Sequence, residues 1–214
     1  MDLFDQSESQ QARQEILKDV VLRRAYAVPA ENAILADLAS VTQAAPLRQM
    51  KTPGGKPMSV MTASCGDFGW VSDQKGYRYA PIDPITQTAW PAMPPSFKQL
   101  AQQAAELAGF PGFEPDACLI NRYNIGAKMG LHQDKDEQDF TQPIVSVSLG
   151  VPAVFQIGGN KRSDQVLKLP LYHGDVLVWG GESRLRFHGV MPLKPAHHQL
   201  LGNIRINLTF RRAS

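Results

Sequence analysis

Residues 143–179 read PIVSVSLGVPAVFQIGGNKRSDQVLKLPLYHGDVLVW, a stretch with four apolar runs that are separated by Gly, Pro, Asn and Asp. Short runs rich in Val, Ile and Leu between turn-forming residues are typical of β-strands. Three more runs of this kind are ACLINRY at 117–123, RFHGV at 186–190 and RINLTFR at 205–211. Seven runs within about 95 residues predict an antiparallel sandwich or barrel, such as a jelly roll.

The first half of the chain has a different character. Apolar residues recur at helical spacing over about 29–45, where Pro46 ends the pattern, and again over about 96–108. We expect Ser96 to cap the second helix and Gly109 to take the left-handed position past its end. The apolar stripe of this helix is expected to be Phe97, Leu100, Ala101, Ala104 and Leu107. Between the helices, residues 47–95 are rich in Gly, Pro and aromatics, which indicates short hairpins that could form a flap.

These patterns predict a mainly β protein of the α+β kind, organised as one compact unit. Residues 1–18 are polar and lack a turn framework, so we expect a flexible N-terminus. The first strand is expected to start at Val20. Residues 19–115 would hold the helices and the flap, and residues 116–214 the β core.

The composition is ordinary for a soluble globular protein, with 43% hydrophobic and 20% charged residues. No stretch approaches the roughly 20 apolar residues that cross a bilayer, and the N-terminus lacks the pattern of a secretory signal. We therefore expect a cytoplasmic location and no membrane partner. In that compartment Cys65 and Cys118 are expected to be reduced, buried thiols, and neither has a CxxC partner for a thiolate metal site.

The formal charge of +2 is weak evidence for nucleic-acid binding, because phosphate contacts need local clusters of Lys and Arg. The candidate clusters are Arg48 with Lys51, Lys128 with Lys135, and Lys161 with Arg162. The alternative for each cluster is an ordinary solvated surface.

A metal site is indicated by Leu131-His132-Gln133-Asp134, because residues at i and i+2 of an extended segment point to one face. A third imidazole from a distant strand would complete two-His-one-carboxylate ligation, which leaves open positions for a chelating cosubstrate and dioxygen. The His-x-Asp pair is a weak motif when it stands alone, and a surface histidine beside acidic neighbours is the alternative.

The C-terminal run RINLTFR strengthens the case. Its polar and apolar residues alternate, so Arg205, Asn207, Thr209 and Arg211 share one face of a strand. The alternative is an amphipathic strand with its Arg side in water. If that face lines a barrel interior, two guanidiniums require an anionic ligand, because an unpaired buried cation is very costly. A dicarboxylate such as 2-oxoglutarate fits, with one Arg at each end.

Taken together, these residues resemble the AlkB family of DNA-repair dioxygenases. The segments that carry the resemblance are Asn121-Arg122-Tyr123, His132-Gln133-Asp134-Lys135-Asp136-Glu137, His188 and R-x-N-x-T-F-R at 205–211. The likeness covers roughly residues 20–212. It implies a double-stranded β-helix, which is a form of jelly roll, for the C-terminal half. It also implies a β-hairpin nucleotide-recognition lid within the flap.

The resemblance further implies the roles of the central residues. His132, Asp134 and His188 would hold Fe(II) as the catalytic metal centre, while His173, His197 and His198 fall outside the pattern. Arg205 would pair with the distal carboxylate of 2-oxoglutarate, together with Tyr123 and Asn207. Arg211 and Asn121 would lie near the carboxylate that chelates the metal. O2 completes the set of cosubstrates.

On the substrate side, the resemblance implies oxidative demethylation of 1-methyladenine and 3-methylcytosine, with release of formaldehyde, succinate and CO2. Trp70 would stack on a flipped-out base beside Tyr77 and Tyr79, although for Tyr79 a place in the flap core is an equal alternative. Asp136 would contact the exocyclic amine, and Arg162 would also bind substrate. Methylation makes these bases cationic, which suits a carboxylate and an indole face. The partner would be single- or double-stranded DNA, with RNA as an alternative, and the enzyme would be a monomer.

Two other interpretations stay open at this point. One is a related 2-oxoglutarate dioxygenase that acts on RNA, protein or a small molecule, because the flap decides the substrate. The other is a non-catalytic metal-binding β-barrel, such as a zinc protein. A pure metal site has no use for Arg205 and Arg211, so their presence favours the enzyme.

Overall fold

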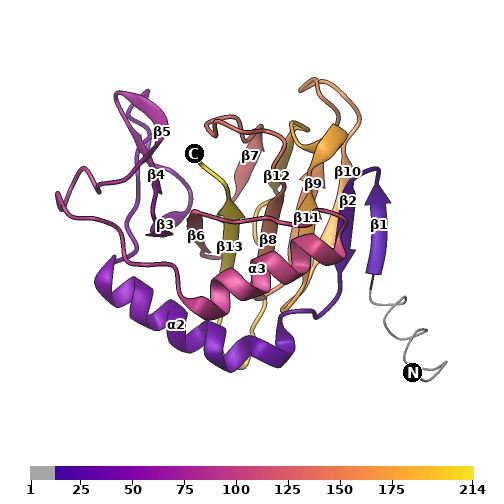
Figure 1. Cartoon of the computed structure of the whole chain (residues 1–214), viewed down its shortest axis with the longest axis horizontal. Coiled ribbons are helices and arrows are strands. Elements are labelled where there is room, and N and C mark those ends of the chain that lie inside the picture. The colour runs from indigo at the N-terminus through magenta and orange to yellow at the C-terminus, as the bar shows by residue number, and fades with distance from the viewer. Residues whose placement is uncertain (1–12) are drawn as a thin grey trace.

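The computed structural model describes residues 13–214 and shows two facing antiparallel sheets with two helices over the outer face of the larger one (Figure 1). The strands are β1 (Arg13–Leu17), β2 (Val20–Arg23), β3 (Met61–Gly66), β4 (Gly69–Asp73), β5 (Gly76–Ala80), β6 (Ala117–Tyr123), β7 (Met129–His132), β8 (Ile144–Gly150), β9 (Ala153–Ile157), β10 (Leu167–Leu171), β11 (Val176–Trp179), β12 (His188–Val190) and β13 (Arg205–Arg211). The helices are α2 (Glu31–Ala44) and α3 (Pro95–Leu107), and single 3-10 turns are η1 (Val28–Ala30) and η2 (Gly181–Ser183).

The larger sheet has the strand order β1-β2-β11-β8-β13-β6-β3, and the smaller one has the order β10-β9-β12-β7. All seven predicted β runs form strands of these two sheets, which confirms the prediction of a jelly-roll core. Strand β7, which had no separate prediction, pairs with β12 at the edge of the smaller sheet. Strands β1, β2 and β3 come from the first half of the chain but belong to the larger sheet, so the core extends beyond residues 116–214.

Strand β13 lies in the middle of the larger sheet and shows how the two faces differ. Ile206, Leu208 and Phe210 point into a core that the sheet forms with α2 and α3. The alternate residues point to the space between the sheets, and all seven residues of the strand are buried. The alternative of a solvent-exposed Arg side is therefore wrong, because both faces of the sheet are covered.

A second apolar core lies between the two sheets. It contains Leu22 and Trp179 from the larger sheet and Phe155, Ile157 and Leu171 from the smaller sheet. This core fills only part of the space between the sheets. The polar face of β13 lies toward the remaining part, where the site described below is found.

The β4–β5 hairpin forms a separate two-stranded sheet that stands beside the open side of the sandwich (Figure 1). This hairpin, which we call the lid, lies within residues 47–95, where short hairpins that form a flap were expected. Its first residue packs closely on the segment that follows the hairpin, because a Cβ on Gly69 would lie 2.1 Å from the indole of Trp90. Glycine is therefore required at the start of the lid.

Several local expectations need correction. Residues 13–17 are not frayed, since β1 pairs with β2 along its length, while residues 1–12 lie outside the described part of the chain. Ser96 does not cap α3: Pro94 is the capping residue, and the Ser96 hydroxyl donates instead to Asp37 of α2 at 2.5 Å. Leu107 is exposed rather than part of the apolar stripe. Gly109 has the expected left-handed conformation, with φ of 99°.

The two cysteines are free and buried, as expected. The structure adds that Cys65 of β3 lies directly opposite Cys118 of β6. Burial raises the pKa of the Cys118 thiol well above its ordinary value. Both residues belong to the core under the helices.

Candidate active site

A cavity of about 610 Å³ opens between the two sheets and the lid. Its lining brings together every residue that was predicted from the sequence for the site. These residues are Trp70, Tyr77, Tyr79, Asn121, Tyr123, His132, Asp134, Asp136, Arg162, His188, Arg205, Asn207 and Arg211. The cavity also meets Met58, Glu137 and Ser146, which the sequence analysis did not propose as site residues.

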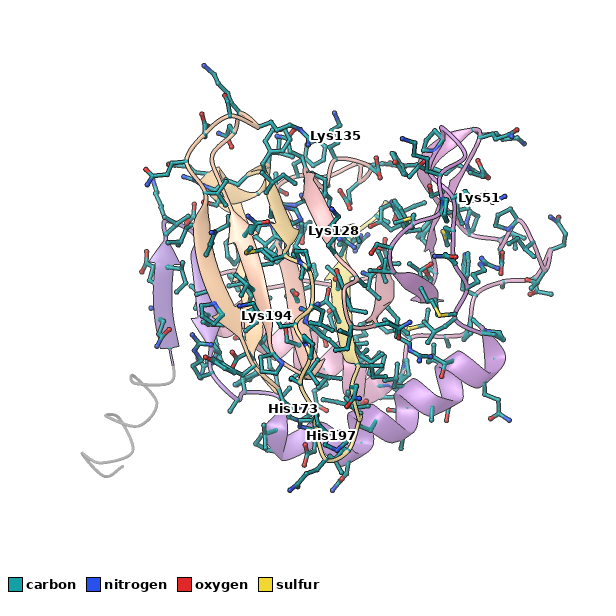
Figure 2. All side chains as sticks on the ribbon, turned by 180° about the vertical axis from the view of Figure 1, so that it is seen from behind. Lys51, Lys128, Lys135, His173, Lys194 and His197 are labelled. Carbon is teal, nitrogen blue, oxygen red and sulfur yellow. The ribbon has the colours of Figure 1, made fainter. Side chains whose placement is uncertain are left out.

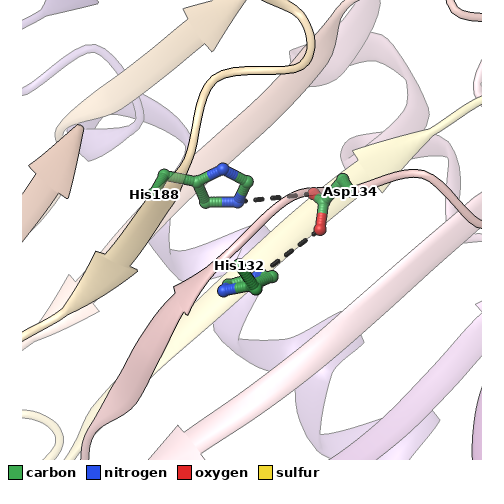
Figure 3. A group of neighbouring side chains, drawn as sticks. All are labelled: His132, Asp134 and His188. Atoms are coloured by element: carbon green, nitrogen blue, oxygen red, sulfur yellow. Dashed lines mark ion pairs between the residues drawn. The ribbon is translucent and has the colours of Figure 1, made fainter. Parts of the chain in front are cut away.

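His132, Asp134 and His188 form one cluster in which a ligand atom of each lies within 4.8 Å of the others (Figure 3). His132 ends β7 and His188 starts β12, and the two are direct partners in the antiparallel pairing of these strands. Asp134 follows two residues after His132. Its Oδ1 is 3.5 Å from Nε2 of His132, and its Oδ2 is 3.6 Å from Nε2 of His188. Neighbouring strands thus produce a cluster from residues far apart in sequence.

Backbone carbonyl groups fix the orientation of the two imidazoles and which nitrogen of each carries the proton. Nδ1 of His132 lies 2.9 Å from the carbonyl oxygen of Gly130, and Nδ1 of His188 lies 3.0 Å from that of Arg186. A carbonyl can only accept, so each Nδ1 is the protonated nitrogen. The lone pair of each Nε2 is then free, which is the arrangement of metal-binding histidines.

Charge in the cluster is set mainly by burial and by Arg211. Burial alone would raise the pKa of Asp134, but Arg211 and His188 outweigh it and hold that pKa well below its ordinary value. Burial and the neighbouring His132 lower the pKa of His188, whereas Asp134 raises that of His132 against the effect of burial. One carboxylate and two imidazoles are the ligand set of non-haem iron(II) oxygenases.

Arg205 lies deeper, on the same face of β13, and is 1% exposed. Its Nη2 donates to the Ser148 hydroxyl at 2.9 Å, and its guanidinium lies over the Tyr123 ring at 5.0 Å. Among the described residues, Nε and Nη1 of Arg205 and Oδ1 of Asn121 are buried without a hydrogen-bond partner. A buried cation with two free donors fits the carboxylate of a bound anion. The residues present therefore fit 2-oxoglutarate.

The other polar residues of β13 are already engaged. The Asn207 amide nitrogen donates to Ser146 and to the carbonyl of Val147, while its oxygen accepts from the Thr209 hydroxyl. Arg211 donates to Oδ2 of Asp134 at 2.6 and 3.0 Å. In this structure Arg211 thus holds the acidic member of the cluster, a contact that the sequence did not predict.

The lid contributes aromatic residues to the mouth of the cavity. The rings of Trp70 and Tyr77 stack at 5.5 Å, and Nε1 of Trp70 donates to Oδ2 of Asp136 at 2.9 Å. The Tyr79 hydroxyl donates to Glu137 at 2.9 Å, so Tyr79 lines the cavity and also ties the lid to the body. Arg162 lies on the loop between β9 and β10, and its guanidinium lies 5.4 Å from the Phe187 ring.

The remaining histidines lie elsewhere, as expected. His173 contacts Glu31 of α2 at 2.8 Å and stacks on His198, and Figure 2 shows His173 and His197 at the α2 end of the molecule. The same view places Lys128 and Lys135 along the side near β7, with Lys51 beside the lid (Figure 2). All three lysines are exposed.

Comparisons with known proteins identify the family of the chain. Residues 19–211 match the 2OG-Fe(II) oxygenase superfamily. The chain is 54% identical to the alpha-ketoglutarate-dependent dioxygenase AlkB of Escherichia coli, over 100% of this chain and 98% of that protein. It is 44% identical to an AlkB homolog of Caulobacter vibrioides, over 87% of this chain and 83% of that one.

A solved structure, that of OsALKBH1, superposes with a TM-score of 0.81 and 28% identity, over 94% of this chain and 99% of that chain. Within residues 13–214, no helix is long and apolar enough to cross a membrane. The match to the Escherichia coli protein spans the whole chain, and His132, Asp134 and His188 lie inside residues 19–211. The chain belongs to the AlkB family, and it is an iron(II)- and 2-oxoglutarate-dependent dioxygenase that uses O2.

Proposed function

We propose that this dioxygenase repairs alkylated nucleic acid by oxidative demethylation of 1-methyladenine and 3-methylcytosine. The observation that carries the proposal is the arrangement of one cavity. It has a two-His-one-carboxylate cluster and a buried, partly unpaired Arg205 inside, and the Trp70–Asp136 pair at its mouth. A non-catalytic metal protein would have no anion to compensate Arg205.

His132, Asp134 and His188 would hold Fe(II) through the two Nε2 atoms and the Asp134 carboxylate. Arg205, with Tyr123, would hold the distal carboxylate of 2-oxoglutarate, while Asn207, whose amide nitrogen donates to Ser146 and Val147, would line the same site. Asn121 and Arg211 would lie near the metal-chelating end. When bound, iron(II), 2-oxoglutarate and O2 supply the oxidising power that converts the N-methyl group to formaldehyde, with succinate and CO2 as coproducts. The protein's own part is to hold these groups and the base in place.

Recognition of the base follows from charge. Methylation at N1 of adenine or N3 of cytosine puts a positive charge on the ring, and a carboxylate and an indole face both attract a cation. Trp70 engages only Oδ2 of Asp136, which leaves Oδ1 to accept a hydrogen bond from an exocyclic amine. A methylated base also pairs poorly, so its extrusion from a duplex costs less.

Exposed cations would meet the phosphates around the base. Arg162 lines the cavity, and Lys128 and Lys135 flank the metal-bearing segment. We propose that the enzyme acts as a cytoplasmic monomer on single- or double-stranded DNA, and that RNA is a second substrate. Binding is then expected to weaken as salt rises, with a modest slope set by a few phosphate contacts.

The decisive assay uses a short single-stranded oligonucleotide that carries one 3-methylcytosine, with formaldehyde and succinate as the two readouts. The proposal expects both products in equal amounts. The unmethylated oligonucleotide is the control. Turnover of 2-oxoglutarate without demethylation of DNA or RNA would contradict the proposed substrate and would favour a protein or a small molecule instead.

Trp70→Ala tests the mouth of the cavity. Loss of base stacking is expected to weaken oligonucleotide binding by about 1–3 kcal/mol, while 2-oxoglutarate binding stays unchanged. Tyr172→Ala is a matched control, because Tyr172 is an exposed aromatic residue outside the cavity. Equal effects of the two substitutions would exclude Trp70 from base recognition.

A further inference from the structure

The two segments that carry the candidate metal ligands are only briefly paired. Strands β7 and β12 share the pairs His188↔His132 and Val190↔Met129, with an irregularity between them. No further pair follows beyond the two histidines. Asp134 therefore lies outside the strand ladder, and something other than backbone pairing must hold it in register with the imidazoles.

Two side chains reach across between the segments at this point. Gln133, between His132 and Asp134, donates from Nε2 to the carbonyl oxygen of Leu185 at 2.6 Å. In the opposite direction, Arg184 donates from Nη1 to the carbonyl oxygen of Asp134 at 2.8 Å. Each segment thus supplies one side chain that binds the backbone of the other.

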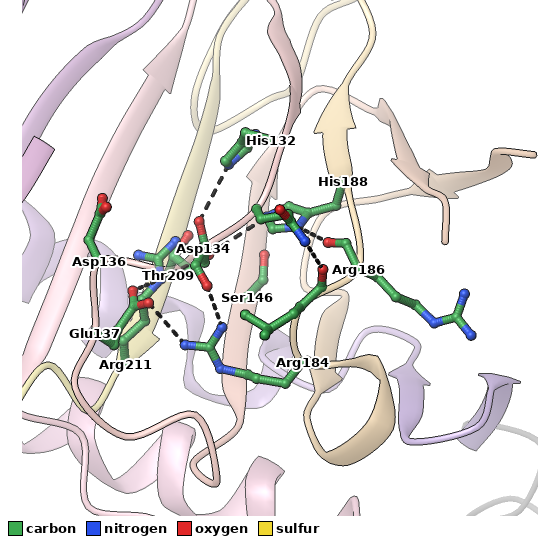
Figure 4. A network of polar contacts seen from close by, with 12 residues as sticks. His132, Asp134, Asp136, Glu137, Ser146, Arg184, Arg186, His188, Thr209 and Arg211 are labelled. Carbon is green, nitrogen blue, oxygen red and sulfur yellow. Dashed lines mark hydrogen bonds and ion pairs between the residues drawn. The ribbon is translucent and has the colours of Figure 1, made fainter. Parts of the chain in front are cut away.

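Arg184 is 3% exposed, and each of its three guanidinium nitrogens donates a hydrogen bond. Figure 4 shows its place in the network. Its Nε donates to the carbonyl of Gln142 at 3.0 Å, and its Nη2 donates to Oε2 of Glu137 at 3.1 Å. The other oxygen of Glu137 lies 3.3 Å from Arg211, which itself holds Asp134. Two carboxylates and two guanidiniums therefore balance in one buried network that fixes the turn after Asp134.

From this geometry we infer that Gln133 and Arg184 form a clasp that positions Asp134 against His132 and His188 before the metal binds. The inference rests on the proposed ligand set. Gln133 and Arg184 are positioning residues, since neither is part of the cluster itself. Groups of this kind orient metal ligands, and their loss typically weakens metal affinity by about 10- to 100-fold.

The neighbouring Arg186 provides a matched control on the same segment. Its Nε donates to the Ser183 hydroxyl and its Nη1 to the carbonyl of Gly158, both at 2.9 Å. Neither partner lies in the segment that contains Asp134. Arg184→Gln and Arg186→Gln therefore remove the same charge from positions two residues apart, but only the first opens the clasp.

The test measures Co(II) binding by calorimetry and visible absorption, with neither 2-oxoglutarate nor nucleic acid present. We expect the wild type to bind one equivalent, and His132→Ala to lose it. The dissociation constant of Arg184→Gln is expected to rise by about 10- to 100-fold, while that of Arg186→Gln stays within about twofold of the wild type. Arg184→Lys restores the charge without the forked geometry, so we expect it to restore little affinity.

A second readout needs no metal. In the metal-free protein, amide hydrogen exchange over residues 132–142 is expected to be faster in Arg184→Gln than in the wild type or Arg186→Gln. If Arg184→Gln does not fold, Gln133→Met decides, because it removes one hydrogen bond from a partly exposed residue. We expect Co(II) affinity to fall several-fold in that variant.

If Arg184→Gln folds and its Co(II) affinity is unchanged, the clasp is overturned. If Arg184→Gln does not fold, unchanged Co(II) affinity in Gln133→Met overturns it. Full recovery of affinity in Arg184→Lys would also overturn it, since charge alone would then account for the effect. A wild type that binds no Co(II), or a His132→Ala variant that binds it normally, would instead overturn the ligand set. The two failures are therefore distinguishable.

Discussion

Arg205 gives a prediction in which stability and binding change in opposite directions. The guanidinium is 1% exposed, has one side-chain hydrogen bond, to Ser148, and keeps two donors without a partner in the protein. Burial lowers the pKa of Arg205, which reflects the cost of holding its charge in this place. The substitution Arg205→Met removes the charge and keeps a similar length of side chain.

The expected loss of 2-oxoglutarate affinity follows from the two free donors. A hydrogen bond to a charged group contributes about 1.5–3 kcal/mol, and about 1.4 kcal/mol corresponds to a factor of ten. We therefore expect the KM for 2-oxoglutarate to rise from about tenfold to more than a hundredfold. The melting temperature of the ligand-free protein, in contrast, is expected to stay unchanged or to rise, because an incompletely compensated cation has left the interior.

The assay is succinate formation against 2-oxoglutarate concentration, together with thermal melts with and without the cosubstrate. Arg122→Met is the control, since Arg122 pairs with Ile206 on the neighbouring strand and so shares the helix side of the sheet. Two results would refute the reasoning. One is an unchanged KM, and the other is a ligand-free destabilisation of roughly 3–5 kcal/mol, the loss expected for a fully paired buried charge.

Three further predictions concern the cluster and the mouth of the cavity. His132→Ala or His188→Ala is expected to abolish 2-oxoglutarate turnover while His173→Ala leaves it nearly intact; succinate release measures all three. Asp136→Asn keeps an acceptor for the Trp70 indole but loses the charge, so discrimination between 3-methylcytosine and cytosine is expected to fall in competition binding, and unchanged discrimination would argue against charge recognition. Because the pKa of Asp134 is lowered, its contribution to the stability of the metal-free protein is present above an unfolded pKa of about 3.9 and is lost as the pH falls. The difference in unfolding free energy between the wild type and Asp134→Asn is therefore expected to stay constant down to about pH 5 and to shrink as the pH falls further toward about 3, which denaturant melts at each pH would show.

The sequence predicted those parts of the fold and site that depend on local patterns. Alternation along 205–211 predicts which β13 side chains share a face, and the i, i+2 spacing places His132 and Asp134 on one side of an extended segment. The structure bears out both placements. Helix α3 was also readable from its apolar spacing, although Pro94 rather than Ser96 begins it.

The contacts that the sequence did not predict all join distant segments. Arg184 and Arg186 look alike in the sequence, and only the fold shows that one faces Asp134 and the other faces Gly158. Ser96 was expected to cap its own helix, but α3 begins at Pro95, so Ser96 lies inside the first turn and its hydroxyl donates to Asp37 of α2 instead. Such partners are chosen by tertiary geometry, about which a local pattern carries no information.

The register of β13 links the fold to the chemistry. A slip of one residue in a strand moves every side chain to the opposite face. Here a slip would bring Arg205 and Arg211 into the apolar core under the helices, and would turn Leu208 toward the metal cluster. Pairing with β6 along the whole strand, and with β8 from Arg205 to Phe210, opposes that slip. The same apolar residues that bind the sheet to the helices therefore hold the two guanidiniums in the cavity, so that a protein folded in this register already presents the cation that a dicarboxylate requires.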